Sequence, residues 1–569
     1  MPSKWPAGFL RRPLRSLVSL HCCPAFAQRS WRLPPAAALA GRPVARRRDF
    51  SSSVGRRNDA EERKWSTPLA KQLAEAISTT GPIPLASYMR MCLTSDLGGY
   101  YTGALADTGR DPFGRTGDFV TSPEVSQVFG ELVGIWFVAE WMAQGRPARG
   151  VELIEVGPGR GTLMDDILRT IRHFGLAKSI DAVYLVEASA QLRDTQKELL
   201  CGPNATLTES KTGYHGVSAR IGLPIVWTET IQAVPKNPDS MPLIVAHEFF
   251  DALPIHAFQA VSVPVAQGPP TPSTPPPSSS SAPPSTSSPP KVEWREMVVS
   301  PTPPGATHDS LGTPRSQRPP PLPGREEEGD GGSSPVPDFQ LTLASGTTRY
   351  ARYLPEMSAR YRALLQTVGP GAVIEVCPDA ALYAAEFALR IGGGRSSSSS
   401  SKSSSSPASH PPKRRPAGAA LVLDYGPGDG TVPVNSLRGI RRHQRVSPFA
   451  EPGLTDLSAD VDFAALAEAA TQASDGVEVH GPVDQADFLL TMGIRERASA
   501  LASKAVASSS TSSSSTGGGS TKAADIERAW KRLVDRGPNG MGKVYKALAI
   551  VPENGGRRRP VGFGGDVVQ

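Results

Sequence analysis

The sequence predicts an α/β fold in which a doubly wound sheet carries an N-terminal helical cap and is interrupted by long disordered insertions. Three observations support this prediction. Short apolar runs alternate with amphipathic helical segments, as in sheets whose parallel strands are joined by helices. A glycine-rich turn follows the first of these runs, and tracts of proline, serine and glycine divide the chain into blocks.

The first strand is predicted over residues 151–156, because this apolar run ends at Gly157 as a buried strand does on entering a turn. A helix is expected from Thr162, where apolar residues recur at helical spacing. Residues 182–187 then predict a second strand, and residues 191–200 a second helix. This alternation favours a doubly wound sheet.

Two further apolar runs, residues 242–247 and 419–424, are predicted to be central strands. Both end in polar residues, at the edge where such sheets bind their ligands. Upstream of the first strand, residues 67–145 have a mainly helical pattern, with an apolar helix around residues 131–136. We expect this block to form the helical cap or lid.

Four low-complexity tracts interrupt the periodic sequence, at residues 266–290, 301–337, 393–417 and 503–521. Their composition offers too little apolar area to offset chain entropy, so we expect disordered loops at surface turns. One interrupted domain over residues 64–555 fits the remaining blocks better than several small domains. Residues 556–569 are expected to form a tail.

The basic residues gather at the N-terminus. Residues 1–50 hold ten basic side chains and one acidic side chain, so the formal charge of +7 falls to −2 without them. A nucleic-acid partner is therefore not expected. An arginine-, serine- and alanine-rich leader without a long apolar core is typical of a mitochondrial presequence, and Arg48 before the serines at 51–53 resembles a matrix-processing site. A disordered basic tail is the alternative.

The cysteines do not predict a metal site. Cys22 and Cys23 lie in the leader, and Cys92, Cys201 and Cys377 have no metal-ligand spacing. We expect free thiols and no bound metal. No segment approaches 18 consecutive apolar residues, so a membrane span is not expected either.

The sharpest signal is a strand carboxylate followed by G-x-G-x-G. This segment comprises Glu155, Gly157, Pro158, Gly159, Gly161 and Thr162. Glycines let the backbone approach an adenosyl ligand, and the helix that follows adds free N–H groups and a positive dipole end. A dinucleotide fingerprint would have a third glycine in place of Thr162, and a P-loop would have Gly-Lys-Ser/Thr, so a phosphate ligand is the weaker interpretation. A glycine turn without a ligand is the alternative.

Glu187, at the end of the second predicted strand, strengthens the adenosyl interpretation. A carboxylate at this position can accept hydrogen bonds from both ribose hydroxyls. A solvated glutamate at a strand end is the alternative.

Nine short segments outside the four tracts carry a family resemblance, and they span about residues 65 to 550 in order. They are GDFVTSPEVS at 117–126, FGEL at 129–132, EVGPGRGT at 155–162, EFFDALP at 248–254, DYG at 424–426, LRG at 437–439 with His443, DLSADVDF at 456–463, GP at 481–482 and MG at 541–542. Together they resemble the complex I assembly-factor protein arginine methyltransferases of mitochondria and their bacterial relatives.

The resemblance implies a Rossmann-like class I methyltransferase that uses S-adenosyl-L-methionine in the mitochondrial matrix. It also implies symmetric dimethylation of an arginine on a core matrix-arm subunit of respiratory complex I, in support of its assembly. No periodicity or spacing identifies that substrate. His247 stands where the family usually has asparagine, which puts in doubt any hydrogen bond assigned to this side chain.

Carboxylates at strand ends are the candidates for holding the acceptor. A guanidinium is a poor nucleophile and is best held by carboxylates that accept paired hydrogen bonds. Glu248 and Asp251 follow the strand at 242–247, so we expect them to orient the guanidinium. Glu124 could close over the cofactor or the substrate. For each acid, the alternative is a carboxylate that caps a helix or braces a loop.

Two other functions stay open. One is a non-catalytic assembly chaperone that uses its sheet to bind a complex I subunit. The other is a small-molecule methyltransferase, because acceptor pockets carry no portable motif.

Overall fold

The computed structural model describes residues 63–104, 117–118, 120–263, 291–311, 336–395, 413–510 and 518–564. The expected presequence at residues 1–50, its processing site and the tract at 266–290 lie outside these residues. None of the helices in the described part of the chain combines the length and the apolar character that a bilayer crossing requires.

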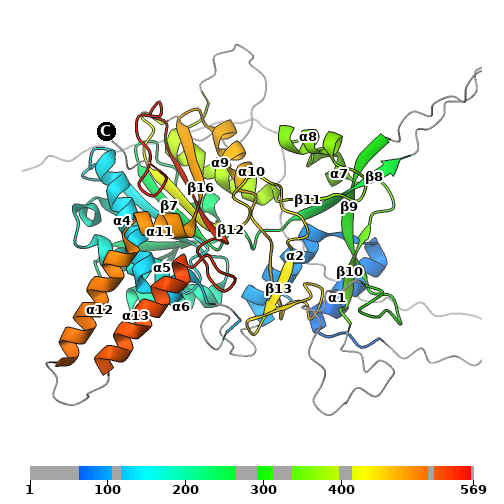
Figure 1. Ribbon diagram of the computed structural model, residues 1–569, viewed down its shortest axis with the longest axis horizontal. Helices are drawn as coiled ribbons and strands as arrows, with labels where there is room; N and C mark the ends of the chain where they lie inside the picture. Colours follow the sequence, from blue (N-terminus) through cyan, green and yellow to red (C-terminus); the bar gives the residue numbers. More distant parts are fainter. Residues whose placement is uncertain are drawn as a thin grey trace, which may run out of the picture. The chain divides into compact units, whose positions relative to one another are not determined.

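The largest sheet has nine strands in the order β16-β17-β12-β7-β2-β3-β6-β5-β4. Figure 1 labels three of them, β16, β12 and β7. Its strands are β2 (Val151–Val156), β3 (Ile180–Val186), β4 (Thr208–Ser210), β5 (Gly213–Val217), β6 (Pro224–Thr228), β7 (Met241–His247), β12 (Ala419–Tyr425), β16 (Val477–Asp484) and β17 (Tyr545–Pro552). The five central strands from β12 to β6 run parallel, and β17 lies antiparallel to β12. The chain winds from β2 out to β6 and then returns to β7 on the other side of β2. The topological switch point therefore lies between β2 and β7.

The predicted central elements are confirmed with small shifts. β2 and the start of helix α5 (Thr162–Ile171) match the sequence prediction, and β7 and β12 match within one residue at each end. β3 begins two residues earlier than predicted and ends at Val186, so Glu187 is the first residue after the strand. Helix α6 (Ala190–Cys201) follows it.

The large sheet is buried on both faces, which explains its nearly continuous apolar strands. Leu243 and Val245 of β7 pack into a core formed with α4 (Gln127–Ala143), α5, α11 (Gln485–Thr491) and part of α13 (Gly518–Val534). Ile244 and Ala246 pack into the opposite core, formed with α9 (Pro378–Gly392) and α10 (Phe463–Ala473).

The helices of residues 67–145, which we expected to form one cap, pack against two different sheets. The apolar helix at 131–136 is part of α4 and belongs to the core of the large sheet, where Trp136 and Phe137 are fully buried. Only α1 (Pro68–Thr80) and α2 (Leu85–Thr94) cover a second, smaller sheet. Helical periodicity identifies an apolar face but not the sheet that the face covers.

The smaller sheet comprises β1 (Ile83–Pro84), β8 (His256–Val263), β9 (Lys291–Pro301), β10 (Phe339–Leu343) and β11 (Val373–Val376). Helices α7 (Arg349–Tyr353) and α8 (Ala359–Thr367) cover the face opposite α1 and α2. A third sheet consists of β13 (Arg438–Arg441), β14 (Gln444–Val446) and β15 (Asp456–Ser458). The strands β8 to β11 follow β7, and the third sheet follows β12. Both insertions thus leave the large sheet at the carboxyl ends of its strands, beside the switch point.

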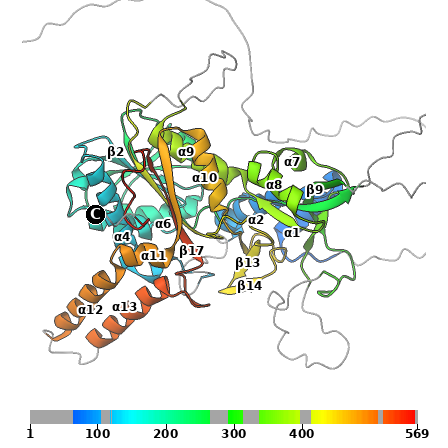
Figure 2. The ribbon, with the colours of Figure 1, turned by 45° about the horizontal axis from the view of Figure 1, so that its top comes forward.

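The described residues correct the expected insertions at three places. Helices α12 (Ile494–Ser510) and α13 (Gly518–Val534) lie side by side and extend from both ends into the tract at 503–521 (Figures 1 and 2). Pro301 ends β9, and the Thr302 amide donates to the Asp338 carbonyl (2.9 Å). At the end of the tract at 393–417, the Ala417 amide donates to the Ile391 carbonyl (3.0 Å). The composition of these tracts predicted more disorder than the structure shows. Alanine favours the helical ends of the tract at 503–521, and the backbone hydrogen bonds of Thr302 and Ala417 need no apolar side chain.

The expected tail is also corrected over residues 556–564. The Phe563 ring is buried and lies 5.7 Å from the Phe488 ring. The indole N–H of Trp136 donates to the Val561 carbonyl (3.2 Å). These contacts join the C-terminal segment to α4 and α11, which composition alone did not indicate.

Candidate functional site

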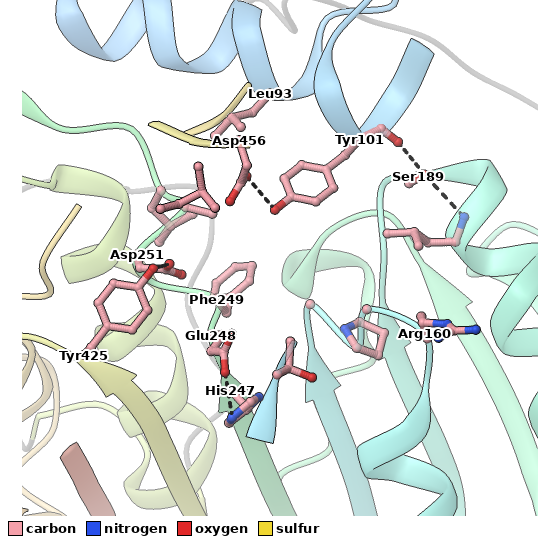
Figure 3. Close-up of a pocket in the computed structure, with 18 of the residues that line it drawn as sticks. Leu93, Tyr101, Arg160, Ser189, His247, Glu248, Phe249, Asp251, Tyr425 and Asp456 are labelled. Carbon is pink, nitrogen blue, oxygen red and sulfur yellow. Dashed lines mark hydrogen bonds and ion pairs between the residues drawn. The ribbon is translucent and has the colours of Figure 1, made fainter. Parts of the chain in front are cut away.

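A cavity of about 740 Å³ lies at the carboxyl ends of β2, β3, β7 and β12. The glycine loop after β2 and the turn after β7 form its floor, and Tyr101 and Asp456 reach it from outside the large sheet (Figure 3). All the site residues predicted from the sequence line this cavity except Gly161. Chain segments separated by several hundred residues therefore meet at the switch point, where doubly wound sheets bind ligands.

The loop after β2 needs glycine at three positions. Gly157, Gly159 and Gly161 have φ of +67°, +54° and +84°, values that side chains with a Cβ rarely adopt. A Cβ on Gly157 would lie 2.7 Å from the Phe249 ring. Gly161 is the N-cap of α5 and lies behind the loop, where its amide donates to the Pro158 carbonyl (2.8 Å). The loop thus presents bare backbone to the cavity.

Two buried carboxylates flank this loop. Glu155, on β2, has one oxygen without a hydrogen-bond partner among the described residues. Burial, and then the charge of Glu187, raise the pKa of Glu155 to about 8. Glu187 accepts hydrogen bonds from the Ser189 amide (2.8 Å) and from the Gln196 side chain (3.1 Å), while burial raises its pKa to about 7. Both acids therefore retain acceptor capacity toward the cavity.

Gln196, on α6, is a site residue that the sequence did not reveal. Its side-chain amide is fully buried and donates to the Gly159 carbonyl (2.7 Å) and to Glu187. Its carbonyl accepts from the indole N–H of Trp227 (2.9 Å). Gln196 therefore connects the glycine loop to Glu187. Helical spacing could have placed it on the buried face of α6, but no pattern marked it as functional.

The turn after β7 brings the two predicted acceptor carboxylates into the cavity. Glu248 has φ of +48°, a strained value for a side chain with a Cβ, and its amide donates to the Leu423 carbonyl (3.0 Å). Burial, and then the charge of Asp251, raise the pKa of Glu248 to about 8. Asp251 accepts a hydrogen bond from the Tyr425 hydroxyl. One oxygen of each acid is buried without a hydrogen-bond partner among the described residues.

Asp424, at the end of β12, holds this turn. One carboxylate oxygen of this fully buried side chain accepts from the amides of Phe249 (3.1 Å) and Phe250 (2.9 Å). Burial, and then the charge of Asp251, raise the pKa of Asp424 well above its ordinary value. The DYG segment includes this residue, but sequence spacing could not show that it contacts a turn 175 residues away.

Glu124 and His247 have largely structural contacts. Glu124 is the N3 residue of the capping box of α3 (Ser122–Val125), and it forms an ion pair with Arg160 of the glycine loop (3.4 Å). The capping alternative for Glu124 therefore holds, although its side chain also lines the cavity. His247 is buried against the Phe129 ring, and burial lowers its pKa to about 3, so it is neutral at physiological pH.

The residues present fit an adenosyl cofactor with a cationic, N–H-bearing end. The unpaired oxygen of Glu155 lies beside bare glycine backbone, where it can accept such a donor. Glu187 is fixed at the neighbouring strand end with lone pairs available for hydroxyl donors. The cavity continues past this half to Asp251 and Tyr425, which leaves room for a second, acceptor group.

Comparisons with known proteins agree with this geometry. A family model described as "Putative S-adenosyl-L-methionine-dependent methyltransferase" matches residues 132–483. The mitochondrial protein arginine methyltransferase NDUFAF7 of Xenopus laevis is 30% identical over 522 residues, which cover 91% of each chain. The human protein of that name is 33% identical over 444 residues, covering 77% of this chain and 76% of that protein.

A solved structure has the same fold. A Burkholderia thailandensis protein bound to S-adenosyl-homocysteine superposes with a TM-score of 0.53 at 20% sequence identity, covering 85% of this chain and 91% of that chain. The description of the matching family model identifies the cofactor as S-adenosyl-L-methionine. The chain therefore belongs to the family of S-adenosyl-L-methionine-dependent methyltransferases that includes the mitochondrial NDUFAF7 proteins.

Proposed function

We propose that this chain is a protein arginine N-methyltransferase that symmetrically dimethylates an arginine on a core matrix-arm subunit of respiratory complex I. The observation that carries the proposal is the cavity at the switch point. Its cofactor half adjoins a second half in which Glu248 and Asp251 each have a buried oxygen without a hydrogen-bond partner among the described residues, and the His247 Nε2 atom lies 3.4 Å from that oxygen of Glu248. Such oxygens suit a guanidinium, which carries positive charge and five N–H donors.

In the cofactor half, we assign binding to six residues that line the cavity: Glu155, Gly157, Pro158, Gly159, Thr162 and Glu187. Gly161 supports the loop from behind as the N-cap of α5. The bound cofactor supplies an electrophilic methyl group next to the acceptor half. The glycine backbone and the N-terminus of α5 would hold its methionine moiety, and Glu187 would accept hydrogen bonds from its ribose hydroxyls. Glu124, through its ion pair with Arg160, braces the loop from above.

In the acceptor half, Glu248 and Asp251 align the guanidinium nitrogen for in-line transfer and shield it from water. The Tyr425 hydroxyl fixes one oxygen of Asp251, which leaves the other for the substrate. The acceptor nitrogen must lose a proton as it gains the methyl group, and these carboxylates are the nearest acceptors. Burial raises the pKa of both acids, and the positive charge of a bound guanidinium lowers it again, which favours the ionised form that holds the substrate and accepts the proton.

The mitochondrial assignment and the complex I substrate rest on the relatives and on the sequence resemblance. The relatives are named mitochondrial, and we place this chain in the matrix because the proposed substrate faces it. The arginine- and serine-rich leader supports import.

The direct test incubates the purified chain with S-adenosyl-L-methionine and isolated matrix-arm core subunits, followed by mass spectrometry of the peptides. We expect symmetric dimethylarginine on one subunit and a loss of at least about 100-fold in rate for Glu248→Gln, since a positioned charge is removed. Glu209→Gln, on the exposed edge strand β4, is the matched control and should retain full activity.

The remaining outcomes decide between the alternatives. A subunit that binds without gaining a methyl group would indicate an assembly chaperone. Methyl transfer confined to small guanidino compounds would indicate a small-molecule methyltransferase. Either result would overturn the proposed function.

A further inference from the structure

Two aspartates that line the acceptor half of the cavity accept hydrogen bonds from tyrosine hydroxyls. The first is Asp251 with Tyr425, from the turn after β7 and the end of β12. The second is Asp456, on β15, which accepts a hydrogen bond from the Tyr101 hydroxyl (3.0 Å). Tyr101 lies on a short π-helix, Tyr100–Ala104, outside the large sheet. Each tyrosine thus holds one oxygen of an aspartate that lines the cavity.

The two pairs share one space. Asp251 and Asp456 border the same opening, with the Tyr101 ring reaching in beside Asp456 (Figure 3). The Ala459 amide donates to the Asp251 backbone carbonyl (2.9 Å), which fixes the segment after β15 against the turn that carries Asp251. Burial, and then the charge of Asp251, raise the pKa of Asp456 to about 7. The shared opening and this backbone hydrogen bond therefore place the two carboxylates on neighbouring walls of one cavity.

Arg438, which lines the same cavity, directs its hydrogen bonds to other groups. Arg438 donates to Asp460 (2.6 Å), and its guanidinium carbon lies 4.4 Å from the centroid of the Tyr425 ring. It lowers the pKa of Asp251, against the larger effect of burial, but its hydrogen bonds go elsewhere. One oxygen of Asp251 remains buried and without a partner among the described residues. A further cation can be accommodated there.

We propose that Asp456, positioned by Tyr101, is the second carboxylate of the acceptor site and that Asp251 and Asp456 together select an acceptor with positive charge and several N–H donors. This inference rests on the proposed function for the placement of the acceptor. A planar guanidinium can present donors to carboxylates on two walls, whereas an ammonium presents three donors from one atom. The site should therefore prefer arginine over lysine.

Tyr101 also connects the two halves of the cavity. Its backbone carbonyl accepts from the Ser189 hydroxyl (2.7 Å), two residues after Glu187. Its hydroxyl reaches Asp456 on the acceptor side. Tyr101 is therefore a positioning residue that acts on the acceptor through Asp456. Removing its hydroxyl leaves the ring in place and keeps the hydrogen bond between its backbone carbonyl and Ser189.

The test measures binding without turnover. The full chain, saturated with S-adenosyl-homocysteine, is titrated by calorimetry with N-acetyl-arginine amide and with N-acetyl-lysine amide. We expect the wild type to bind the arginine probe more tightly than the lysine probe. Asp456→Asn should weaken arginine binding by about 10-fold, as expected for a lost charged hydrogen bond, and Tyr101→Phe by about 3-fold. Affinity for S-adenosyl-homocysteine should stay within about 2-fold, since neither change touches the glycine loop.

Tyr361→Phe is the matched control. Its hydroxyl also donates to an aspartate, Asp462 (3.0 Å), but neither residue lines the cavity, so this variant should bind both probes as the wild type does. Thermal unfolding of every variant checks that the fold is intact, and Tyr101→Phe tests the pair if Asp456→Asn fails to fold.

The outcomes separate this inference from the proposed function. Equal arginine binding by wild type, Asp456→Asn and Tyr101→Phe would overturn the inference, as would a wild type that binds neither probe. Arginine binding that depends on Asp456 in a protein that transfers no methyl group would overturn the proposed function and leave the cation site standing.

Discussion

At the scale of single residues, Gln196 connects the glycine loop to Glu187 in the cofactor half of the cavity. Its buried amide contacts the Gly159 carbonyl, Glu187 and the Trp227 indole. Without it, the buried Trp227 indole would lose its acceptor, at a cost of about 1–3 kcal/mol, and Glu187 would keep only its bond from the Ser189 amide. The shape of the cofactor site therefore depends on a residue that does not line the cavity itself.

We predict that Gln196→Leu loses at least about 10-fold in affinity for S-adenosyl-homocysteine, because the loop and Glu187 are no longer held together. Calorimetry measures this change. Gln191→Leu, at an exposed position on the same helix, is the control and should bind normally. Unchanged binding by Gln196→Leu in a folded protein would show that the loop holds its shape unaided.

The buried carboxyls also predict a pH dependence of stability. The pKa of Glu155 and that of Glu248 rise from 4.5 to about 8 on burial, so the folded protein keeps protons that the unfolded chain has released between these values. The free energy of unfolding of the ligand-free protein should therefore fall as pH rises through this window. His247, whose pKa is lowered to about 3 from 6.5, acts in the opposite direction only below pH 6.5.

We therefore expect a lower melting temperature at about pH 8 than at about pH 7, a range in which His247 no longer contributes. Each group contributes at most about 1.4 kcal/mol per pH unit. The double variant Glu155→Gln, Glu248→Gln should flatten the decline, while Glu209→Gln should not. Circular dichroism melts measure this, and an equally steep decline in the double variant would mean that other groups cause it.

At the scale of elements, the C-terminal segment is joined to α4 by a buried ion pair. The two terminal guanidinium nitrogens of Arg558, Nη1 and Nη2, donate to Glu140 at 2.7 and 2.8 Å, and Glu140 is fully buried. Removing one partner of such a bidentate pair leaves a buried charge without compensation.

Arg558→Ala should lower the free energy of unfolding by about 3 kcal/mol. Denaturant unfolding measures the loss, with Arg559→Ala, at an exposed neighbouring position, as the control. A difference below about 0.5 kcal/mol between the two variants would show that Glu140 finds another partner or is neutral.

Elements with a strong local signal could be predicted from the sequence, and elements defined by distant partners could not. β2 and α5 were predictable because a fully apolar run meets a glycine turn and then a helical repeat. The smaller sheet was not, since β9 alternates polar and apolar residues beside tracts of low complexity. The structured ends of those tracts depend on backbone pairing, which composition does not report.

The same division holds for the site. Local patterns predicted the cavity-lining residues that lie at the ends of β2, β3 and β7, such as Glu155, Glu187 and Glu248. They could not predict Tyr101, Asp456 or Gln196, because these residues act through partners that are distant in the chain or lie on a neighbouring helix. Tertiary contact, rather than motif, makes those three part of the site.

At the scale of the whole molecule, residues 264–290 connect two paired strand ends of the smaller sheet. Val263 at the end of β8 and Lys291 at the start of β9 are paired in antiparallel register, so the chain on either side of residues 264–290 meets at adjacent positions. A two-residue turn can join such a pair.

We predict that replacing residues 264–290 with Asn-Gly changes the melting temperature by no more than about 3 °C and leaves S-adenosyl-homocysteine binding unchanged, because loop length affects closure entropy only weakly. Calorimetry and thermal melts measure both. A large loss of binding would assign these residues a role at the site.

The central claim is that the bare backbone after β2 binds the adenosyl cofactor. Isothermal titration of S-adenosyl-homocysteine into wild type and Gly159→Val tests it most directly, with melts to confirm that both are folded. We predict saturable binding by the wild type and none by the variant, whose branched side chain fills the ligand's space at a backbone φ of +54°. Binding of equal strength by both proteins, or none by the wild type, would contradict the account.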